Sequence, residues 1–388
     1  MSIDAPTASS APSDAHGEKQ SMRILGAVLE RSGAPRPYTA SRPISVDELE
    51  LDLPGEGELL VRIEAAGICH SDLSVVNGDR PRPLPMLLGH EAAGIVELVG
   101  AGVTGVHVGE RVVITFLPRC GVCTACETGG RLPCVDGSAA NAAGTLLSGG
   151  RRIRRSSGSV EHHLGVSAFA THAVVDARSV VPVDADVPPD VAAVLGCAVL
   201  TGGGAVINAG RPAQGETTIV VGMGGVGTAA LLVAVALNAG PVIAVDVNPE
   251  KLQHALELGA ERALTPEDAL KSNLRAELVI EAAGHQFAFE AAFALTAPGG
   301  RTVTVGLPAE DAISRISPVA VTAEARTIIG SYLGSAVPSR DIPHYVRLWR
   351  EGRLPLESLI SGHVELQGAN EAMDDLADGR VLRQVIVF

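Results

Sequence analysis

The sequence predicts an α/β protein that combines a β-rich domain with a doubly wound parallel sheet. Its 388 residues are enough for two ordinary domains, and 46% of them are hydrophobic, which is enough for a large core. Residues 23 to about 115 form short apolar stretches separated by glycine and proline, a pattern that predicts strands and turns. Beyond residue 200 the pattern changes to alternating strands and helices, which is typical of a parallel sheet covered by helices on both faces.

The β-rich part has two well-marked strand segments, at residues 58–68 and 91–100. A similar pattern returns in SVVPVDADVPP around residue 180, and the chain closes with the apolar strand QVIVF over 384–388. Short strands with turn residues at this spacing predict a β-rich domain.

The second part contains a helix of small apolar residues between two apolar strands. We expect that helix to be closed by Gly240, and the following helix to begin with Pro249 and to end at Gly259. The predicted elements are, in order, a strand at 217–222, a helix at 226–240, a strand at 241–248, a helix at 249–258, a strand at 277–284, a helix at 287–296 and a strand at 301–306.

Charge and composition limit the partners. The formal net charge of −14 argues against nucleic acid or an anionic membrane, because lysine and arginine hold both. The chain has no run of 18 apolar residues, so we expect no membrane-spanning helix. The first 20 residues lack the charged, apolar and small-residue order of a signal peptide. We therefore expect a disordered tail over residues 1–22 and a cytoplasmic location.

A glycine motif lies between the predicted strand at 217–222 and the helix that follows it. Gly222, Gly224 and Gly227 fit G-x-G-x-x-G, with Gly225 and Val226 inside the motif. These glycines suit a tight turn, close approach of a pyrophosphate and close packing of helix on strand. Asp246 follows Gly227 by 19 residues, at the end of the next strand, where a carboxylate binds the ribose hydroxyls. The pattern predicts a dinucleotide site that favours NAD over NADP. The alternative is a tight turn without a ligand.

Four cysteines are close together in the sequence, with spacing C-x2-C-x2-C-x7-C: Cys120, Cys123, Cys126 and Cys134. Four thiolates can surround one tetrahedral Zn²⁺ and leave it no open position, so this site would brace a loop. The alternatives are an iron–sulfur cluster, a nucleic-acid-binding zinc module and two disulfides. The sequence around Cys134 and the acidic net charge disfavour the first two.

The other two cysteines are Cys69 in GICHSD and Cys197 in GCAVLTGG. His90 follows Cys69 by 21 residues, in GHE. Two thiolates and one imidazole would leave a fourth position open, as in a catalytic zinc site. Taken alone, a cysteine is more often a small buried apolar residue, and a histidine more often a core or surface residue.

The motifs CHSD, GHE, GCAVLTGG and VGMGGVG, with the four-cysteine segment, occur in an order and spacing that resembles the zinc-containing medium-chain alcohol dehydrogenases. The resemblance runs from about residue 23 to residue 388, and EHHLGVSAFATHAVVD at 161–176 is similar to the longer branch with animal-type and aryl-alcohol dehydrogenases. It implies a GroES-like catalytic domain from residues 23–198 and 333–388 and a Rossmann domain from residues 199–332.

The resemblance also implies residue roles. Cys69, His90 and Cys197 would bind a catalytic zinc, and the four clustered cysteines a structural zinc, which makes two Zn²⁺ per chain. Asp72 would hydrogen-bond His90, Glu91 would lie behind the metal, and Ser71 would accept the alcohol proton. His70 and Arg383 would approach the pyrophosphate, and Lys251 would reach the adenosine ribose. Thr201 would pack near the nicotinamide, and Phe116 would line the substrate pocket.

The activity implied is a reversible hydride transfer that interconverts a primary alcohol and its aldehyde, with NAD as the hydride acceptor. The alcohol can be aromatic or bulky. The alternatives are a zinc-free quinone or enoyl reductase and a non-catalytic nucleotide-binding protein. The longer branch favours a homodimer over a homotetramer.

The chain departs from the resemblance at the end of the proton relay and in the loop that borders the substrate channel. Ser74 stands where many relatives place a histidine. Arg80 and Arg82 stand where glutathione-adduct dehydrogenases carry acids, and they are either a solvated pair neutralised by acids or a site for a substrate carboxylate. Gly203 should leave room for a bulky substrate.

Overall fold

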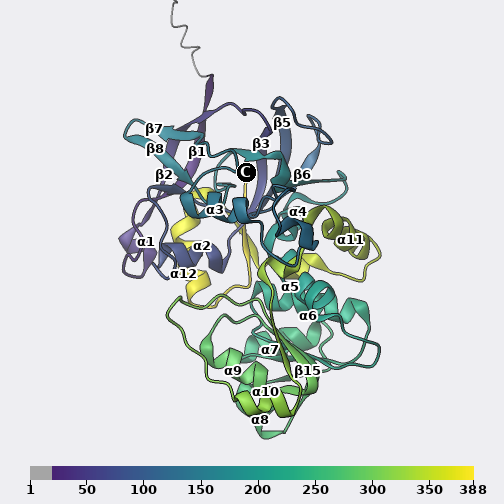
Figure 1. The fold of residues 1–388 in the computed structure, drawn as a ribbon. Helices are drawn as coiled ribbons and strands as arrows, with labels where there is room; N and C mark the ends of the chain where they lie inside the picture. Colours follow the sequence, from purple (N-terminus) through teal and green to yellow (C-terminus); the bar gives the residue numbers. More distant parts are fainter. Residues whose placement is uncertain (1–19) are drawn as a thin grey trace, which may run out of the picture.

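The structure is a computed structural model and describes residues 20–388. The chain forms two lobes, with the β-rich part at the top of Figure 1 and the parallel sheet with its helices at the bottom. The final segment of the chain returns to the β-rich lobe, where the helix α12 (Ala369–Ala377) packs beside α1 (Tyr38–Ser41) and α2 (His70–Val76).

The β-rich lobe contains a small closed barrel and a seven-stranded sheet. The barrel strands, in order, are β1 (Ser21–Leu29), β2 (Ile44–Asp52), β7 (Ile153–Arg155), β8 (Gly158–His162) and β4 (Met86–Leu87). The sheet runs β10 (Val180–Val183), β6 (Arg111–Ile114), β5 (Ala92–Val99), β3 (Glu58–Gly67), β18 (Gln384–Val387) and β17 (Gly362–Val364), and β9 (His172–Asp176) pairs with β3. The register Val385↔Gly67 brings the C-terminal strand beside the end of β3, two residues before Cys69.

The second lobe is built on a six-stranded parallel sheet. Its order is β13 (Arg262–Leu264), β12 (Val242–Val245), β11 (Thr218–Val221), β14 (Ala276–Glu281), β15 (Thr296–Thr304) and β16 (Thr327–Gly330). The chain order reverses between β11 and β14, which is the switch point where doubly wound sheets bind ligands. The predicted fold class, a GroES-like β-rich domain with a Rossmann sheet, is confirmed.

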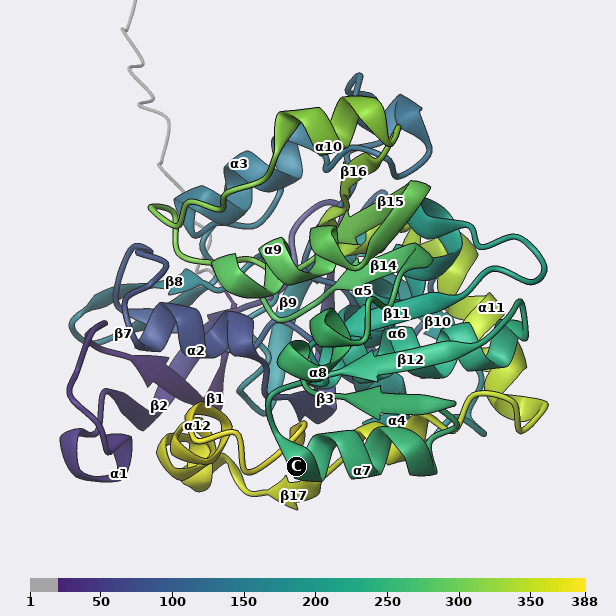
Figure 2. The same ribbon diagram turned by 90° about the horizontal axis from the view of Figure 1, so that it is seen from below.

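Helices lie on both faces of the parallel sheet because successive strand residues face opposite sides (Figure 2). Val220 of β11 belongs to the main core, whereas Ile219 and Val221 belong to a second apolar cluster on the other face. The helices of this lobe are α6 (Gly225–Leu237), α7 (Pro249–Glu257), α8 (Pro266–Lys271), α9 (Gln286–Ala294) and α10 (Pro318–Ala323).

Several predicted element ends were wrong. The helix predicted at 226–240 ends at Leu237, because Asn238 takes the left-handed conformation (φ 52°) expected of Gly240. The helix predicted at 287–296 ends at Ala294, since Thr296 already begins β15. Most of the predicted tail lies outside the described residues, but Ser21 and Met22 belong to β1.

A continuous apolar helix over residues 189–210 connects the lobes. It consists of α4 (Pro189–Val194), the π-helical turn η3 (Leu195–Val199), α5 (Leu200–Gly204) and a second π-helical turn, η4 (Ala205–Gly210). By length and composition alone this helix could cross a membrane, but its most apolar 18-residue window is 89% buried in the protein, as in the core helix of a globular fold. A Cβ on Gly202 would lie 2.7 Å from the amide of Ala230, so glycine lets this helix pack closely on α6.

Candidate active site

Cys69, His90 and Cys197 meet in the core although they lie far apart in the sequence. Their ligand atoms all lie within 4.8 Å of one another, and all three residues are buried. Cys69 is the N-cap of α2, where its amide donates to the carboxylate of Asp72 (2.9 Å). Cys197 lies in the π-helical turn η3, an irregularity often found at functional sites. The spacing of the atoms suits three ligands of one metal ion.

His90 is held in an orientation that suits a metal ligand. Its Nδ1 lies 2.9 Å from Oδ1 of Asp72, and both side chains are fully buried. Burial raises the pKa of Asp72, but the neighbouring His90 and His163 lower it to about 2, so the carboxylate is ionised. The Nε2 of His90 is buried without a hydrogen-bond partner among residues 20–388. A buried nitrogen without a partner is costly, and a metal ion would satisfy it.

Glu91 and Arg383 form a buried ion pair behind this cluster. Gly67 leaves room for Glu91, since any Cβ there would overlap its carboxylate. Burial raises the pKa of Glu91 to about 7, against the lowering effect of Arg383. The Nη2 of Arg383 also donates to Sγ of Cys69 (3.5 Å). A hydrogen bond from Cys197, and next the charge of Arg383, hold the pKa of Cys69 well below its usual value. The contacts of Cys69 with Cys197 and Arg383 therefore favour the thiolate that binds metal.

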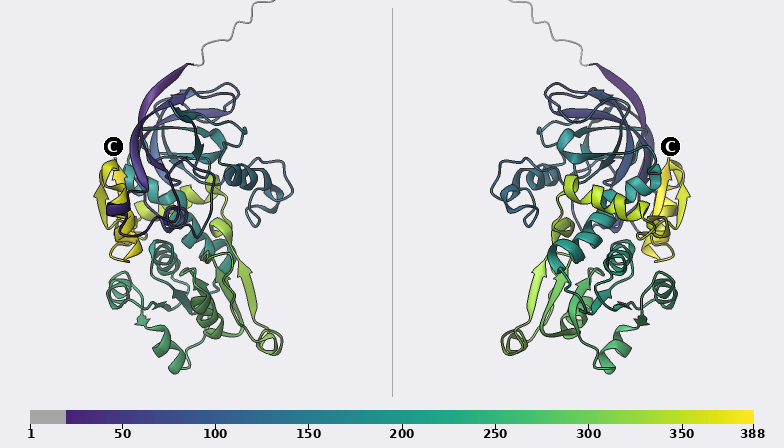
Figure 3. Two further views of the ribbon diagram at one scale, coloured as in Figure 1. Left: turned by 90° about the vertical axis from the view of Figure 1, so that its left-hand side faces the viewer. Right: turned by 90° about the vertical axis from the view of Figure 1, so that its right-hand side faces the viewer.

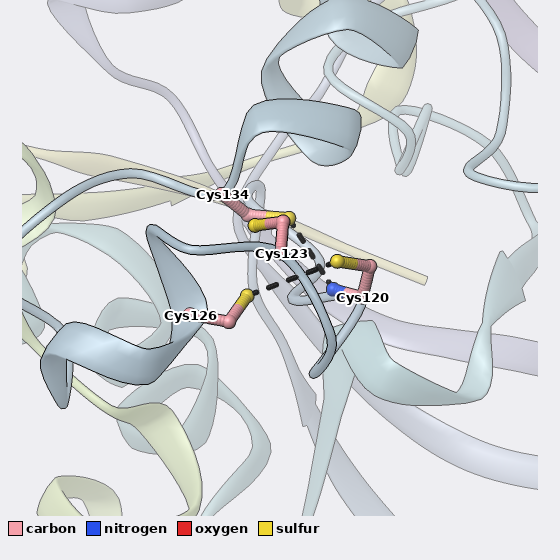
Figure 4. A group of neighbouring side chains, drawn as sticks. All are labelled: Cys120, Cys123, Cys126 and Cys134. Atoms are coloured by element: carbon pink, nitrogen blue, oxygen red, sulfur yellow. Dashed lines mark hydrogen bonds between the residues drawn. The ribbon is translucent and has the colours of Figure 1, made fainter.

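The four clustered cysteines lie on a segment beside α3 (Val135–Ala143) that projects from the β-rich lobe (Figure 3). The sulfurs of Cys120 and Cys126 are 3.9 Å apart, and those of Cys123 and Cys134 are 4.0 Å apart (Figure 4). These separations are too long for disulfides and suit the edges of a tetrahedral thiolate site. The backbone amides of Val135 and Cys126 hold the pKa of Cys123 to about 6, which favours a thiolate ligand.

The glycine motif has the geometry of a dinucleotide loop. Gly222 has a φ of 93°, and a Cβ there would lie 2.7 Å from the amide of Ala283. At Gly224, the N-cap of α6, a Cβ would meet nothing within 4 Å, so the backbone is open to a ligand. At Gly227 a Cβ would overlap the carbonyl of Gly222, so glycine is needed where helix packs on turn. The arrangement points the N-terminus of α6 at open space that suits a pyrophosphate.

Asp246 lies beside this loop at the end of β12. Its carboxylate accepts hydrogen bonds from the amides of Met223 (2.6 Å) and Asn248 (2.8 Å), which fix it against the glycine turn. The side chain is half-buried. Val226, inside the motif, is half-buried at the start of α6.

Three nitrogen-bearing side chains, those of Arg383, His70 and Lys251, lie near the glycine loop. A Cβ on Gly225 would lie 2.8 Å from Nη2 of Arg383, so this guanidinium borders both sites. Burial lowers the pKa of His70, and the charges of Arg383 and Lys251 lower it further, which places these side chains near one another. The charges of Arg383 and Lys251 suit a pyrophosphate. Thr201 is buried in α5, one helical turn beyond Cys197.

Phe116, the residue predicted to line the substrate pocket, belongs to a set of aromatic rings that contact one another edge to face. Phe116 lies 5.5 Å from the ring of His90 and 5.9 Å from that of Tyr332. His163 lies 5.4 Å from His90 on another side, and its Nδ1 is 3.2 Å from Asp72. Sequence reasoning missed the roles of His163 and Tyr332. The only signal was the pair of histidines in EHHLG, and nothing local marks Tyr332.

Gly203, Ser71 and Ser74 were singled out in the sequence near the predicted substrate site. A Cβ on Gly203 would lie 2.7 Å from the hydroxyl of the buried Tyr345, so Gly203 serves helix packing, and the prediction that it leaves room for substrate was wrong. The Oγ of Ser71 lies 4.0 Å from Sγ of Cys69, at the edge of the metal cluster. Ser74 donates from its hydroxyl to the carbonyl of His70 (2.7 Å), back into its own helix.

Two parts of the chain match models of known protein families. Residues 55–185 match the alcohol dehydrogenase GroES-like domain, and residues 225–351 match the zinc-binding dehydrogenase domain. The chain is 36% identical over 370 residues to the NDMA-dependent alcohol dehydrogenase of Amycolatopsis methanolica, covering 90% of this chain and 97% of that one.

Two solved structures share the fold over almost their whole length. Benzyl alcohol dehydrogenase from Acinetobacter calcoaceticus has a TM-score of 0.86 and 30% identity, covering 95% of this chain and 99% of that chain. An alcohol dehydrogenase zinc-binding domain protein from Burkholderia ambifaria has a TM-score of 0.87 and 30% identity, covering 95% and 100%. The fold and site define a zinc-binding oxidoreductase. The chain belongs to the zinc-containing medium-chain alcohol dehydrogenase family.

Proposed function

We propose that this protein is a zinc-dependent alcohol dehydrogenase that transfers hydride reversibly between a primary alcohol and NAD. The observation that carries the proposal is the buried set of Cys69, His90 and Cys197, in which Nε2 of His90 has no partner among the described residues. The glycine loop with Asp246 in the same molecule supports a dinucleotide as the hydride acceptor. Two Zn²⁺ per chain are expected, one in each cysteine cluster.

A zinc ion held by these residues would act as a Lewis acid toward a bound alcohol, and the hydride chemistry belongs to the nicotinamide. The residues of the protein orient the metal ligands, accept the proton and surround the substrate. Asp72 would accept the Nδ1 proton of His90 in a hydrogen bond, which leaves Nε2 for the metal ion. Ser71 is the hydroxyl beside Cys69 that would accept the alcohol proton. Phe116 and Tyr332 supply apolar ring surface for the body of the substrate.

The preference for NAD rests on Asp246. Two backbone amides fix its carboxylate at the edge of the glycine turn. In that place it would accept hydrogen bonds from both ribose hydroxyls and repel a 2′-phosphate.

A panel of alcohols and aldehydes, read by NADH absorbance, tests this proposal. Benzyl alcohol belongs in the panel because one related structure is a benzyl alcohol dehydrogenase. NDMA belongs there as a second acceptor because one relative is named for its dependence on it. Turnover of an alcohol would exclude a non-catalytic nucleotide-binding protein. The bound metal would set the enzyme apart from zinc-free quinone or enoyl reductases.

We also propose that the protein is a homodimer. The strand β16 lies at the edge of the parallel sheet, with β15 as its only strand neighbour within residues 20–388. Ile328 on this strand and Val319 on α10 are exposed apolar side chains near that edge. An open edge with apolar neighbours can pair with a second copy about a two-fold axis. Analytical ultracentrifugation would separate a dimer from a monomer or a tetramer.

A further inference from the structure

Two arginines lie in the loop between α2 and β4, close to the candidate substrate pocket. The guanidinium of Arg80 donates to the carbonyl of Leu307 (3.3 Å), which follows β15 in the other lobe. Arg82 has no ion pair or hydrogen bond to any residue from 20 to 388, and its Nε is buried without a partner. Neither arginine is neutralised by a described acid, although the chain carries a net charge of −14. The described residues therefore give no support to the alternative in which nearby acids balance this pair.

The charge of Arg82 acts on the pocket itself. Burial raises the pKa of Tyr332, and the charges of Arg80 and Arg82 oppose that rise. Tyr332 is the last ring in the series of contacts that runs from His90 through Phe116. The cation is thus close to the outer ring of this series.

A buried guanidinium nitrogen without a partner carries a desolvation cost that a bound anion would remove. Guanidinium suits a carboxylate, because it donates two parallel hydrogen bonds to the two oxygens. The ring contacts run from the metal-ligand candidate His90 through Phe116 to Tyr332, which is 37% exposed. They would cover an aromatic body whose reacting carbon faces the metal cluster.

We propose that Arg82 binds a carboxylate at the far end of the substrate, and that the enzyme prefers aromatic alcohols or aldehydes carrying this group opposite the reacting carbon. This inference rests on the proposed dehydrogenase function and names its substrate class. Arg80 is mainly committed to the carbonyl of Leu307 and contributes less.

The test compares 4-carboxybenzyl alcohol with 4-(hydroxymethyl)benzamide, a neutral compound of nearly the same shape, and with benzyl alcohol. In the native enzyme kcat/KM should be about tenfold higher for the carboxylate than for the amide. That ratio should fall close to one in Arg82→Gln and recover in part in Arg82→Lys. High salt should reduce it in the native enzyme.

Two matched variants control for general charge effects. Arg23→Gln removes the same charge from β1, where Arg23 pairs with Glu48 and its side chain is 80% exposed, and it should leave the ratio unchanged. Arg80→Gln should reduce the ratio less than Arg82→Gln does. A native ratio near one, or a ratio that survives in Arg82→Gln, would overturn the inference.

Binding measurements separate this inference from the proposed function. Calorimetry with 4-carboxybenzyl alcohol and NADH, which cannot react together, should show the same preference over the amide and its loss in Arg82→Gln. If no alcohol is oxidised, the proposed function fails, and calorimetry still decides whether Arg82 binds the carboxylate. The affinity for NADH alone should be unchanged in Arg82→Gln. A tenfold loss would assign this arginine to a cofactor phosphate and contradict the inference.

Discussion

Asp72 and His90 share a fully buried hydrogen bond of 2.9 Å between Oδ1 and Nδ1. The low pKa of Asp72, about 2, keeps the carboxylate ionised, so it accepts a hydrogen bond from the Nδ1 proton of His90, and a metal ion would take the place of a proton on Nε2. That nitrogen has no other partner in the described chain and lies among the sulfurs of Cys69 and Cys197. The hydrogen bond therefore prepares the histidine as a metal ligand.

The four-cysteine site should stabilise the fold without taking part in turnover. We expect Cys123→Ser to lose one zinc per chain and to lower the free energy of unfolding by more than the roughly 1 kcal/mol of a typical substitution, because a structural metal contributes to folding. Val122→Ser is the matched control, since Val122 is the neighbouring side chain and is 81% exposed. Metal analysis and thermal unfolding are the measurements. A variant that keeps two zinc ions would contradict the assignment of this site.

Asp246 should determine the choice of dinucleotide. Repulsion and desolvation of a 2′-phosphate beside its fixed carboxylate should cost about 2 kcal/mol, or roughly thirtyfold in affinity. The native enzyme should therefore prefer NAD. Asp246→Gly should reduce the difference in affinity between NADH and NADPH. Binding constants for NADH and NADPH, measured by fluorescence for both proteins, test this. Equal affinity of the native protein for the two cofactors would refute it.

The proton pathway should depend on pH more steeply than in relatives with a histidine in place of Ser74. A serine hydroxyl cannot act as a base near neutral pH, and that of Ser74 is bonded to the carbonyl of His70. Alcohol oxidation should therefore accelerate as pH rises above neutrality. Ser74→His should increase the rate at neutral pH. A flat native profile with no gain in the variant would show that another group completes the relay.

His162 should make folding sensitive to acid. Burial, and next the charges of Arg152 and Arg151, lower its pKa to about 3, well below its unfolded value near 6.5. Between these two values the unfolded chain binds one more proton, so stability is complete above pH 6.5 and is lost as pH falls toward 3. The loss should approach about 1.4 kcal/mol per pH unit.

Chemical unfolding at pH 7, 6 and 5 measures this slope. His162→Gln should unfold with a shallower dependence on pH than the native protein. His107→Gln serves as the control, because His107 is 76% exposed, and it should leave the slope unchanged. Metal loss in acid affects all three proteins alike. Equal slopes for the native protein and His162→Gln would contradict the expectation.

Features encoded by neighbouring residues could be predicted from the sequence. The cysteine spacing, the glycine motif and the strand–helix alternation are local patterns, and the structure confirms the elements that they imply. The helix end at Asn238 was missed because asparagine can also adopt the left-handed conformation. The orientation of Gly203 depends on the packing of its helix, which contains two π-helical turns.

Contacts between distant residues could be expected only where the resemblance implied them, as for Cys69, His90 and Cys197. Glu91 and Arg383 lie 292 residues apart, and only the pairing of β18 with β3 brings the C-terminal strand to the metal cluster. Tyr332 reaches the pocket from the far lobe, where nothing in the local sequence marks it. Arg82 could be assigned to the pocket loop by resemblance, but its lack of a partner became visible only in the folded chain.

The central claim is that the site of Cys69, His90 and Cys197 holds a zinc ion required for oxidation of an alcohol by NAD. The most direct measurement combines metal analysis with NADH formation from benzyl alcohol, for the native protein and Cys197→Ser purified without chelator. We predict two zinc ions and turnover for the native protein. For the variant we predict one zinc, no turnover above background and unchanged NADH binding. Native turnover with a single zinc, or a Cys197→Ser variant that still oxidises the alcohol, would contradict the account.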